Sequence, residues 1–258
     1  MFFRGESFKD FLRFYPIVSA IIALQVVIWA FMYFNLPYWL EMYYYGIGQN
    51  LAIQQGDYWR LVTPIFMHDI NGITHILFNS FALVLFGPAL ETMLGKMKFI
   101  LLYLGSGVFA NLFTYLIDME STTLHLGASG AIYALLGFII YLVFFVPGML
   151  DPASRQIALT YTFIGVVMTF IQPGVSIPGH VFGLVGGFAF GPILANNLNV
   201  YRPQYTRRRK TSPDGVNFDP NRWNKRRRRL RINPNLSAIL WWVVIILAAL
   251  GFIASIIF

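Results

Sequence analysis

The chain of 258 residues is 57% hydrophobic, only 12% charged and free of cysteine. This composition excludes an ordinary soluble domain, in which about 25% of residues are charged, and it leaves no disulfide framework, zinc–thiolate site or thiol nucleophile. The net charge of +8 is concentrated in residues 202–231, which hold twelve Lys or Arg and two Asp (net +10), so the rest has a net charge of −2. We therefore expect a multi-pass membrane protein with one strongly basic segment.

The apolar runs are long enough to predict seven membrane spans, since a transmembrane helix needs about 20 mostly apolar residues. Residues 1–15, ahead of the first run, form a basic, amphipathic segment without a signal-peptide cleavage site. Residues 35–71 are aromatic and irregular, which predicts a structured loop partly sunk in the membrane interface. The predicted spans are residues 16–34, 72–90, 98–117, 127–146, 156–172, 178–197 and 236–258.

This pattern predicts an all-α polytopic membrane protein. With the N-terminus in the cytoplasm, eighteen of the 19 Lys and Arg residues lie inside and Arg60 alone lies outside, as the positive-inside rule requires. The arginine content and the lack of cysteine suggest a bacterial plasma membrane. The predicted parts are a cytoplasmic amphipathic N-terminus (1–15), a six-span domain (16–197), a basic cytoplasmic linker (198–235) and a seventh transmembrane helix (236–258).

The basic block at residues 202–231 has two interpretations. Runs of Arg and Lys can bind nucleic acid, but a polybasic segment between two apolar spans is typical of a tether on anionic lipid. We therefore expect membrane lipids, and not nucleic acid, as the partner of this block.

Two polar residues begin apolar runs. Gly127-Ala128-Ser129-Gly130 opens the run at 127–146, and Gly179-His180 opens the run at 178–197. A hydroxyl and an imidazole at membrane depth are costly without partners, so they are candidates for function. In the predicted orientation both lie at the outer end of their spans. The free amides and the positive dipole end of a helix N-terminus favour the oxyanion of an acyl-transfer reaction.

Glycine spacing predicts that these two runs approach closely. Gly183 and Gly187 follow His180 at small-xxx-small spacing, and Gly130 offers a narrow face on the other run. Such packing would bring His180 within hydrogen-bond reach of Ser129, so that the imidazole could act as a general base. The alternative is a histidine that packs between helices and bonds a neighbouring carbonyl.

Other polar and aromatic residues lie at a similar depth. Tyr133, one helical turn after the serine, could stack on the histidine and orient it, or could be an ordinary core residue. His75 and Asn79 are one turn apart and could both donate to an oxyanion. A metal site is the rival hypothesis, but it lacks a coordination set, and no cofactor is expected. The remaining histidines, His68 and His125, are interpreted as structural or interfacial.

Over about residues 55–195 the chain resembles the rhomboid family of intramembrane serine proteases, because it carries several of that family's motifs in the family's order. They are Trp59-Arg60, His75-xxx-Asn79, Glu91-xxx-Gly95, Gly127-x-Ser129-Gly130 and His180-xx-Gly183-xxx-Gly187. The resemblance implies a rhomboid-like core of six transmembrane helices, here with one more at the C-terminus (6+1).

The resemblance also implies roles for single residues. Ser129 matches the family's nucleophile and His180 its general base, with Tyr133 packed on that histidine. The oxyanion donors would be His75, Asn79 and the Ser129 amide, supported by Gly127. The motif residues Trp59 and Arg60 would be structural, and Glu91 would help to fix the inner helix ends.

The expected function is hydrolysis of peptide bonds in or near transmembrane segments of other membrane proteins. Substrates would enter between the second and fifth spans, past the loop at 170–178. The rival reading is a non-catalytic membrane protein, either a transporter or a chaperone-like binder of transmembrane helices. No convincing internal repeat supports a transporter.

Overall fold

The computed structural model describes residues 1–2 and 4–201. The predicted seventh span at 236–258 and the basic block at 202–231 lie outside the described residues, as does most of the predicted linker at 198–235.

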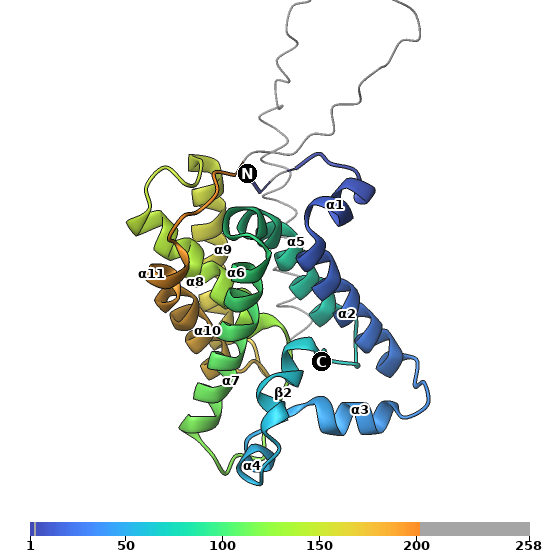
Figure 1. The fold of residues 1–258 in the computed structure, drawn as a ribbon. Helices are drawn as coiled ribbons and strands as arrows, with labels where there is room; N and C mark the ends of the chain where they lie inside the picture. The colour runs from blue at the N-terminus through green and yellow to red at the C-terminus, as the bar shows by residue number, and fades with distance from the viewer. Residues whose placement is uncertain (3, 202–258) are drawn as a thin grey trace, which may run out of the picture. The chain divides into compact units, whose positions relative to one another are not determined.

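The described part is a bundle of helices with two very short strands (Figure 1). The helices are α1 (Phe8–Phe14), α2 (Pro16–Tyr33), α3 (Trp39–Gly46), α4 (Asn50–Gln54), α5 (Thr74–Leu94), α6 (Lys96–Ile100), α7 (Ser106–Ile117), α8 (Ser129–Phe145), α9 (Pro152–Ile171), α10 (Ile177–Ala189) and α11 (Gly191–Leu194). The shorter elements are 3₁₀ turns η1 (Tyr58–Leu61) and η2 (Thr63–Phe66), a π-helical turn η3 (Leu101–Gly105), and strands β1 (Gly48–Gln49) and β2 (Leu124–His125).

Five of the predicted core spans form helices long and apolar enough to cross a membrane. They are α2, α5, the continuous segment α6–η3–α7, α9, and α10 with α11. The remaining core span, the fourth in chain order at 127–146, forms α8, which is apolar but only 17 residues long. Residues 131–139 of α8 are all buried, so this helix is surrounded mainly by protein.

Local signals set the helix ends. Asp151 accepts a hydrogen bond from the Ser154 amide at 3.0 Å, and Pro152 occupies the first helical position, so α9 begins earlier than predicted. The Ser176 hydroxyl accepts from the Gly179 amide at 3.2 Å and caps α10 in the same way. Gly127, with φ of +128°, turns the chain just before α8 in a conformation that favours glycine.

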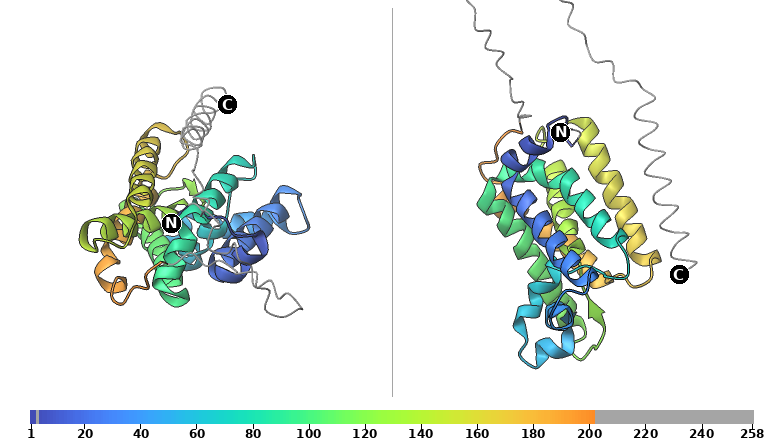
Figure 2. Two further views of the ribbon diagram at one scale, coloured as in Figure 1. Left: turned by 90° about the horizontal axis from the view of Figure 1, so that it is seen from above. Right: turned by 90° about the vertical axis from the view of Figure 1, so that its right-hand side faces the viewer.

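The predicted loop at 35–71 is ordered by its own polar contacts. Arg60 is 7% exposed and donates to the carbonyls of Tyr44 and Ile47 at 2.6 and 2.7 Å. The Trp59 indole donates to the Tyr45 carbonyl at 3.0 Å. Trp59 and Arg60 thus hold the C-terminal end of α3 against η1. The loop elements α3 and α4 and strand β2 gather at one end of the bundle (Figures 1 and 2).

Glu91, near the C-terminal end of α5, joins this helix to α2. Its carboxylate accepts from the amides of Ile17 and Val18 at 3.1 and 2.9 Å, and the side chain is 4% exposed. These amides belong to the first turn of α2, whose N–H groups have no intrahelical acceptor. A buried carboxylate is tolerated because it is hydrogen-bonded and lies at the positive end of a helix.

Helices α8 and α10 touch backbone to backbone. A Cβ on Gly183 would overlap the Gly130 carbonyl, and one on Gly187 would overlap the Ala134 carbonyl. The predicted close approach of these two helices is therefore confirmed. Side chains larger than hydrogen would separate the helices.

We predict that Gly187→Ala destabilises the bundle by about 1–3 kcal/mol, because overpacking forces backbone shifts. Gly105→Ala is the matched control, since its nearest neighbours would lie 3.5 and 3.6 Å from the new methyl group, and Ala is the better helix former. Thermal unfolding of the purified proteins in detergent measures the difference. Equal unfolding midpoints for the two variants would contradict the packing argument.

Candidate active site

The end of the bundle that holds the loop elements also holds the candidate catalytic pair. Ser129 is the first residue of α8 and His180 lies in the first turn of α10. Ser129 Oγ and His180 Nε2 are 2.7 Å apart, which is hydrogen-bond distance. The predicted proximity of the two side chains is confirmed, and it follows from the contact of α8 with α10.

Thr169, in the last turn of α9, joins this pair to a second ring. Its Oγ1 donates to the Gly165 carbonyl at 2.9 Å and lies 2.8 Å from both His180 Nδ1 and the Tyr133 hydroxyl. A hydroxyl has one hydrogen and a carbonyl only accepts, so the single hydrogen of the Thr169 hydroxyl is donated to the Gly165 carbonyl. Thr169 therefore accepts hydrogen bonds from His180 Nδ1 and from Tyr133.

These contacts determine which ring nitrogen of His180 carries the hydrogen. With Nδ1 protonated, a neutral imidazole has its lone pair at Nε2, where it faces the Ser129 hydroxyl. That tautomer is the one a general base requires. Tyr133 stacks on the imidazole with ring centroids 4.1 Å apart and an interplanar angle of 18°, so the predicted stacking is also present.

Thr169 is absent from the residues predicted from sequence. A threonine in an apolar helix usually bonds a carbonyl of its own helix, so the residue type alone carries no functional signal. A weak signal is its spacing of seven residues, or two helical turns, from Thr162. Both threonines are buried, which gives α9 a polar stripe toward the bundle.

His75, in the first turn of α5, lies next to Gly127. The Asp69 amide donates to His75 Nδ1 at 3.4 Å, so Nδ1 holds a lone pair and Nε2 carries the hydrogen. A Cβ on Gly127 would stand 2.8 Å from His75 Nε2 and 3.7 Å from Ser129 Oγ. Because glycine has no Cβ, the His75 ring can lie close to the Gly127 backbone, on the side that also faces Ser129 Oγ.

The other predicted oxyanion donors are placed differently. The Gly127 amide donates to the Pro64 carbonyl at 2.9 Å, so it is already used. The Ser129 amide belongs to the first turn of α8 and has no intrahelical acceptor. The Asn79 carboxamide is buried and donates to the His75 carbonyl at 3.0 Å, which fixes it on its own helix and does not bring it onto Ser129.

Known proteins resemble this chain over more than half of its length. A family model described as the Rhomboid domain matches residues 55–197. The chain is also 42% identical to YdcA of Bacillus subtilis (strain 168) over 193 residues, which cover 73% of this chain and 93% of that protein. The chain belongs to the rhomboid family. Rhomboid protease GluP of the same bacterium is 33% identical over 144 residues, 56% of this chain and 27% of that protein. Rhomboid-like protease 1 of Toxoplasma gondii is 27% identical over 198 residues, 72% of this chain and 67% of that protein.

Family membership and the candidate spans together make this rhomboid an integral, multi-pass membrane protein.

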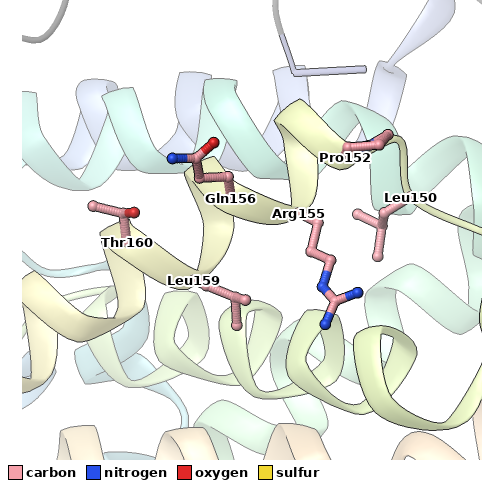
Figure 3. A pocket seen from close by; sticks show the side chains of 6 residues that line it. All are labelled: Leu150, Pro152, Arg155, Gln156, Leu159 and Thr160. Atoms are coloured by element: carbon pink, nitrogen blue, oxygen red, sulfur yellow. The ribbon is translucent and has the colours of Figure 1, made fainter.

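A cavity of about 640 Å³ opens next to the candidate pair, bordered by His75 and by Ile177 and Pro178 just before His180. A second hollow, of about 340 Å³, lies on the first turns of α9 (Figure 3). It is lined by Leu150, Pro152, Arg155, Gln156, Leu159 and Thr160. Thr169 is more than two helical turns further along α9, so the hollow in Figure 3 is separate from the candidate pair.

The two remaining histidines of this rhomboid lie beside the site. His68 is fully buried with its ring centroid 5.1 Å from that of His75, so it is structural and not interfacial. Burial, followed by the nearby His75 ring, lowers the pKa of His68 to about 3. Burial also lowers the pKa of His125 to about 4. Both rings are therefore neutral at pH 7.

We predict that Thr169→Val slows the reaction of Ser129 with a fluorophosphonate probe by about tenfold, because His180 loses the acceptor that fixes its tautomer. Thr169→Ser keeps the hydroxyl and should react at close to the wild-type rate. The control is Thr162→Val, which removes a buried hydroxyl that bonds only the Ala158 carbonyl of its own helix at 2.8 Å. A similar slowing by Thr162→Val would assign the effect to α9 stability.

Proposed function

We propose that this chain is an intramembrane serine endopeptidase that cleaves peptide bonds in or near transmembrane segments of other membrane proteins. The observation that carries the proposal is the hydrogen bond of 2.7 Å between Ser129 Oγ and His180 Nε2, with Nδ1 occupied by Thr169. It is supported by relatives that are named rhomboid proteases. The proposed catalytic unit is a Ser-His dyad, because neither α8 nor α10 contains a carboxylate.

In the proposed acylation step, Ser129 Oγ attacks the scissile carbonyl carbon while its proton moves to His180 Nε2. The imidazolium that forms is stabilised by the hydrogen bond from Nδ1 to Thr169 and by the stacked Tyr133 ring. His180 then donates the proton to the leaving amine, and an acyl-enzyme remains on Ser129. Water, activated by His180, hydrolyses the ester and releases the carboxylate product.

The tetrahedral oxyanion would lie between His75 Nε2 and Ser129, next to Gly127. His75 Nε2–H and the Ser129 amide are the proposed donors, with added stabilisation from the α8 dipole. The Asn79 carboxamide donates to the backbone carbonyl of His75. It would reach the oxyanion only after moving away from that carbonyl. The proposal assigns the motif residues Gly130, Gly183 and Gly187 to helix packing.

The proposed topology is a 6+1 arrangement in which α8 is the short fourth core helix and residues 236–258 are the seventh span. The N-terminus would lie in the cytoplasm of a bacterial cell, which puts the candidate pair near the outer face of the plasma membrane. Residues 202–231 would lie on the inner face and contact anionic lipid. Substrates would reach Ser129 between α5 and α9, past the loop that follows Ile171.

We predict that Ser129→Ala and His180→Ala each lower cleavage of a single-span substrate by at least about a thousandfold. The assay uses purified protein in liposomes and measures product by mass spectrometry. Ser19→Ala is the control, since the Ser19 hydroxyl bonds the Tyr15 carbonyl of its own helix at 2.7 Å. Cleavage that survives Ser129→Ala would refute the nucleophile, and binding without any cleavage would refute the endopeptidase.

We further predict a preference for substrates whose helices unwind easily. A helical substrate keeps its carbonyls in backbone hydrogen bonds, so the scissile bond becomes accessible only after local unwinding. Gly costs about 1 kcal/mol and Pro about 3 kcal/mol in a helix, so a Gly-Pro pair near the cut should raise kcat/KM about tenfold or more over a leucine-rich span. Equal rates for the two substrates in the same liposome assay would contradict this prediction.

A further inference from the structure

The cavity of about 640 Å³ beside the candidate pair has the size of a ligand pocket. Its walls come from the loop before α5, the end of α7, strand β2 and the segment between α9 and α10. The lining residues used below are Asn50, Asp69, His75, Asp118 and His125. His75 connects the cavity to the site, because its Nε2 lies beside Gly127 on the side that also faces Ser129 Oγ.

The charge of the cavity is negative. Asp69 and Asp118 are the carboxylates in its lining, and no Lys or Arg is among the lining residues. The two lining histidines do not offset this charge. His125 is neutral at pH 7 because burial lowers its pKa to about 4, and His75 accepts a hydrogen bond at Nδ1 from the Asp69 amide.

A buried acceptor in the lining has no partner among the described residues. Asn50 is 4% exposed, and its Nδ2 donates to the carbonyls of Thr114 and Asp118 at 3.1 and 2.7 Å. Two carbonyl partners fix which end of the carboxamide is nitrogen. Its Oδ1 is buried with no hydrogen bond in the described part of the chain, an arrangement that a hydrogen-bond donor would relieve.

The Asp69 carboxylate can also accept a further hydrogen bond. Its Oδ1 accepts from the amide and the side chain of Asn71 at 2.9 and 2.8 Å, which leaves Oδ2 for a ligand. The cavity therefore offers carboxylate oxygens, and the unpartnered Asn50 carboxamide oxygen is covered within its wall. Lys and Arg side chains carry three and five donors and no acceptor, so they complement this set. No group of three or more His, Cys, Asp or Glu side chains among the described residues fits a metal ion.

We propose that this cavity is a subsite that binds a Lys or Arg side chain of the substrate, within a few residues of the scissile bond. The proposal rests on the endopeptidase function and adds a specificity to it. Asp69 and Asp118 attract the cation, and Asn50 Oδ1 accepts one of its hydrogens after a small shift of the groups that cover it. The aliphatic stem packs on Ile177 and Leu126, which also line the cavity. A substrate with Asp or Glu at the same position is repelled.

The test is a substrate panel in liposomes of zwitterionic lipid. A single-span substrate carries Lys, Ala or Glu at each of the positions that flank the cut, and kcat/KM is measured for each. At the position that reaches the cavity, Lys should exceed Glu by about tenfold, since each partly exposed charge pair contributes a factor of about 1.4 to 5. Asp118→Asn should reduce that ratio to about threefold, and the double variant with Asp69→Asn should reduce it to about one.

Glu120→Gln is the matched control, because it removes the same charge from the same loop but Glu120 does not line the cavity. It should leave the Lys-to-Glu ratio unchanged. Each ratio is measured within one variant, so a loss of folded protein cancels. Raising the salt concentration should weaken the preference of the wild type.

The outcomes separate the two proposals. Cleavage of all three substrates at equal rates would overturn the subsite and leave the endopeptidase standing. A preference that survives the double variant, or that falls equally in Glu120→Gln, would also overturn the subsite, since it would then be a property of the general surface charge. Failure to cleave any substrate, with Ser129→Ala indistinguishable from wild type, would overturn the proposed function itself.

Discussion

The contact between α8 and α10 is the constraint on which the rest of the site depends. Gly183 and Gly187 on α10 have only a hydrogen as side chain. The backbone of α10 therefore contacts the carbonyls of Gly130 and Ala134 on α8 directly. The two helices begin at the same end of the bundle, so their first turns bring Ser129 and His180 to 2.7 Å. Backbone contact is stiffer than side-chain contact, because backbone atoms cannot change rotamer to absorb an error of an ångström. The distance on which the proposed proton transfer depends is thus set by packing.

A third helix then sets the chemistry of the pair. Thr169 on α9 has one hydrogen, and the Gly165 carbonyl takes it, so the imidazole must donate at Nδ1 and accept at Nε2. In serine hydrolases with a triad, a carboxylate does this work. In the proposed site a neutral hydroxyl takes this place, which avoids placing an anion among apolar helices, where charge is costly. Thr169 bonds the imidazole at Nδ1, and the Tyr133 ring stacks on one of its faces.

The sequence predicted much of this structure because its signals are local. Apolar runs located the helices, and the glycines around His180 predicted the approach of α8 to α10. Thr169 was beyond reach, since its role depends on the rotation of α9 against the other helices. The length of α8 was overestimated at 127–146, because Gly127 adopts a positive φ and the helix starts at Ser129. Residue types predict burial well, but they do not predict which group a hydroxyl forms a hydrogen bond with.

Gly127 shows why a short motif carries more information than its length suggests. Its φ of +128° suits glycine, its amide is held by the Pro64 carbonyl, and its missing Cβ lets the His75 ring lie close to its backbone. An alanine would be strained in the backbone, and its methyl group would clash with His75, the proposed oxyanion donor. Three independent requirements meet at one position, so glycine there reports the turn, the loop contact and the site together.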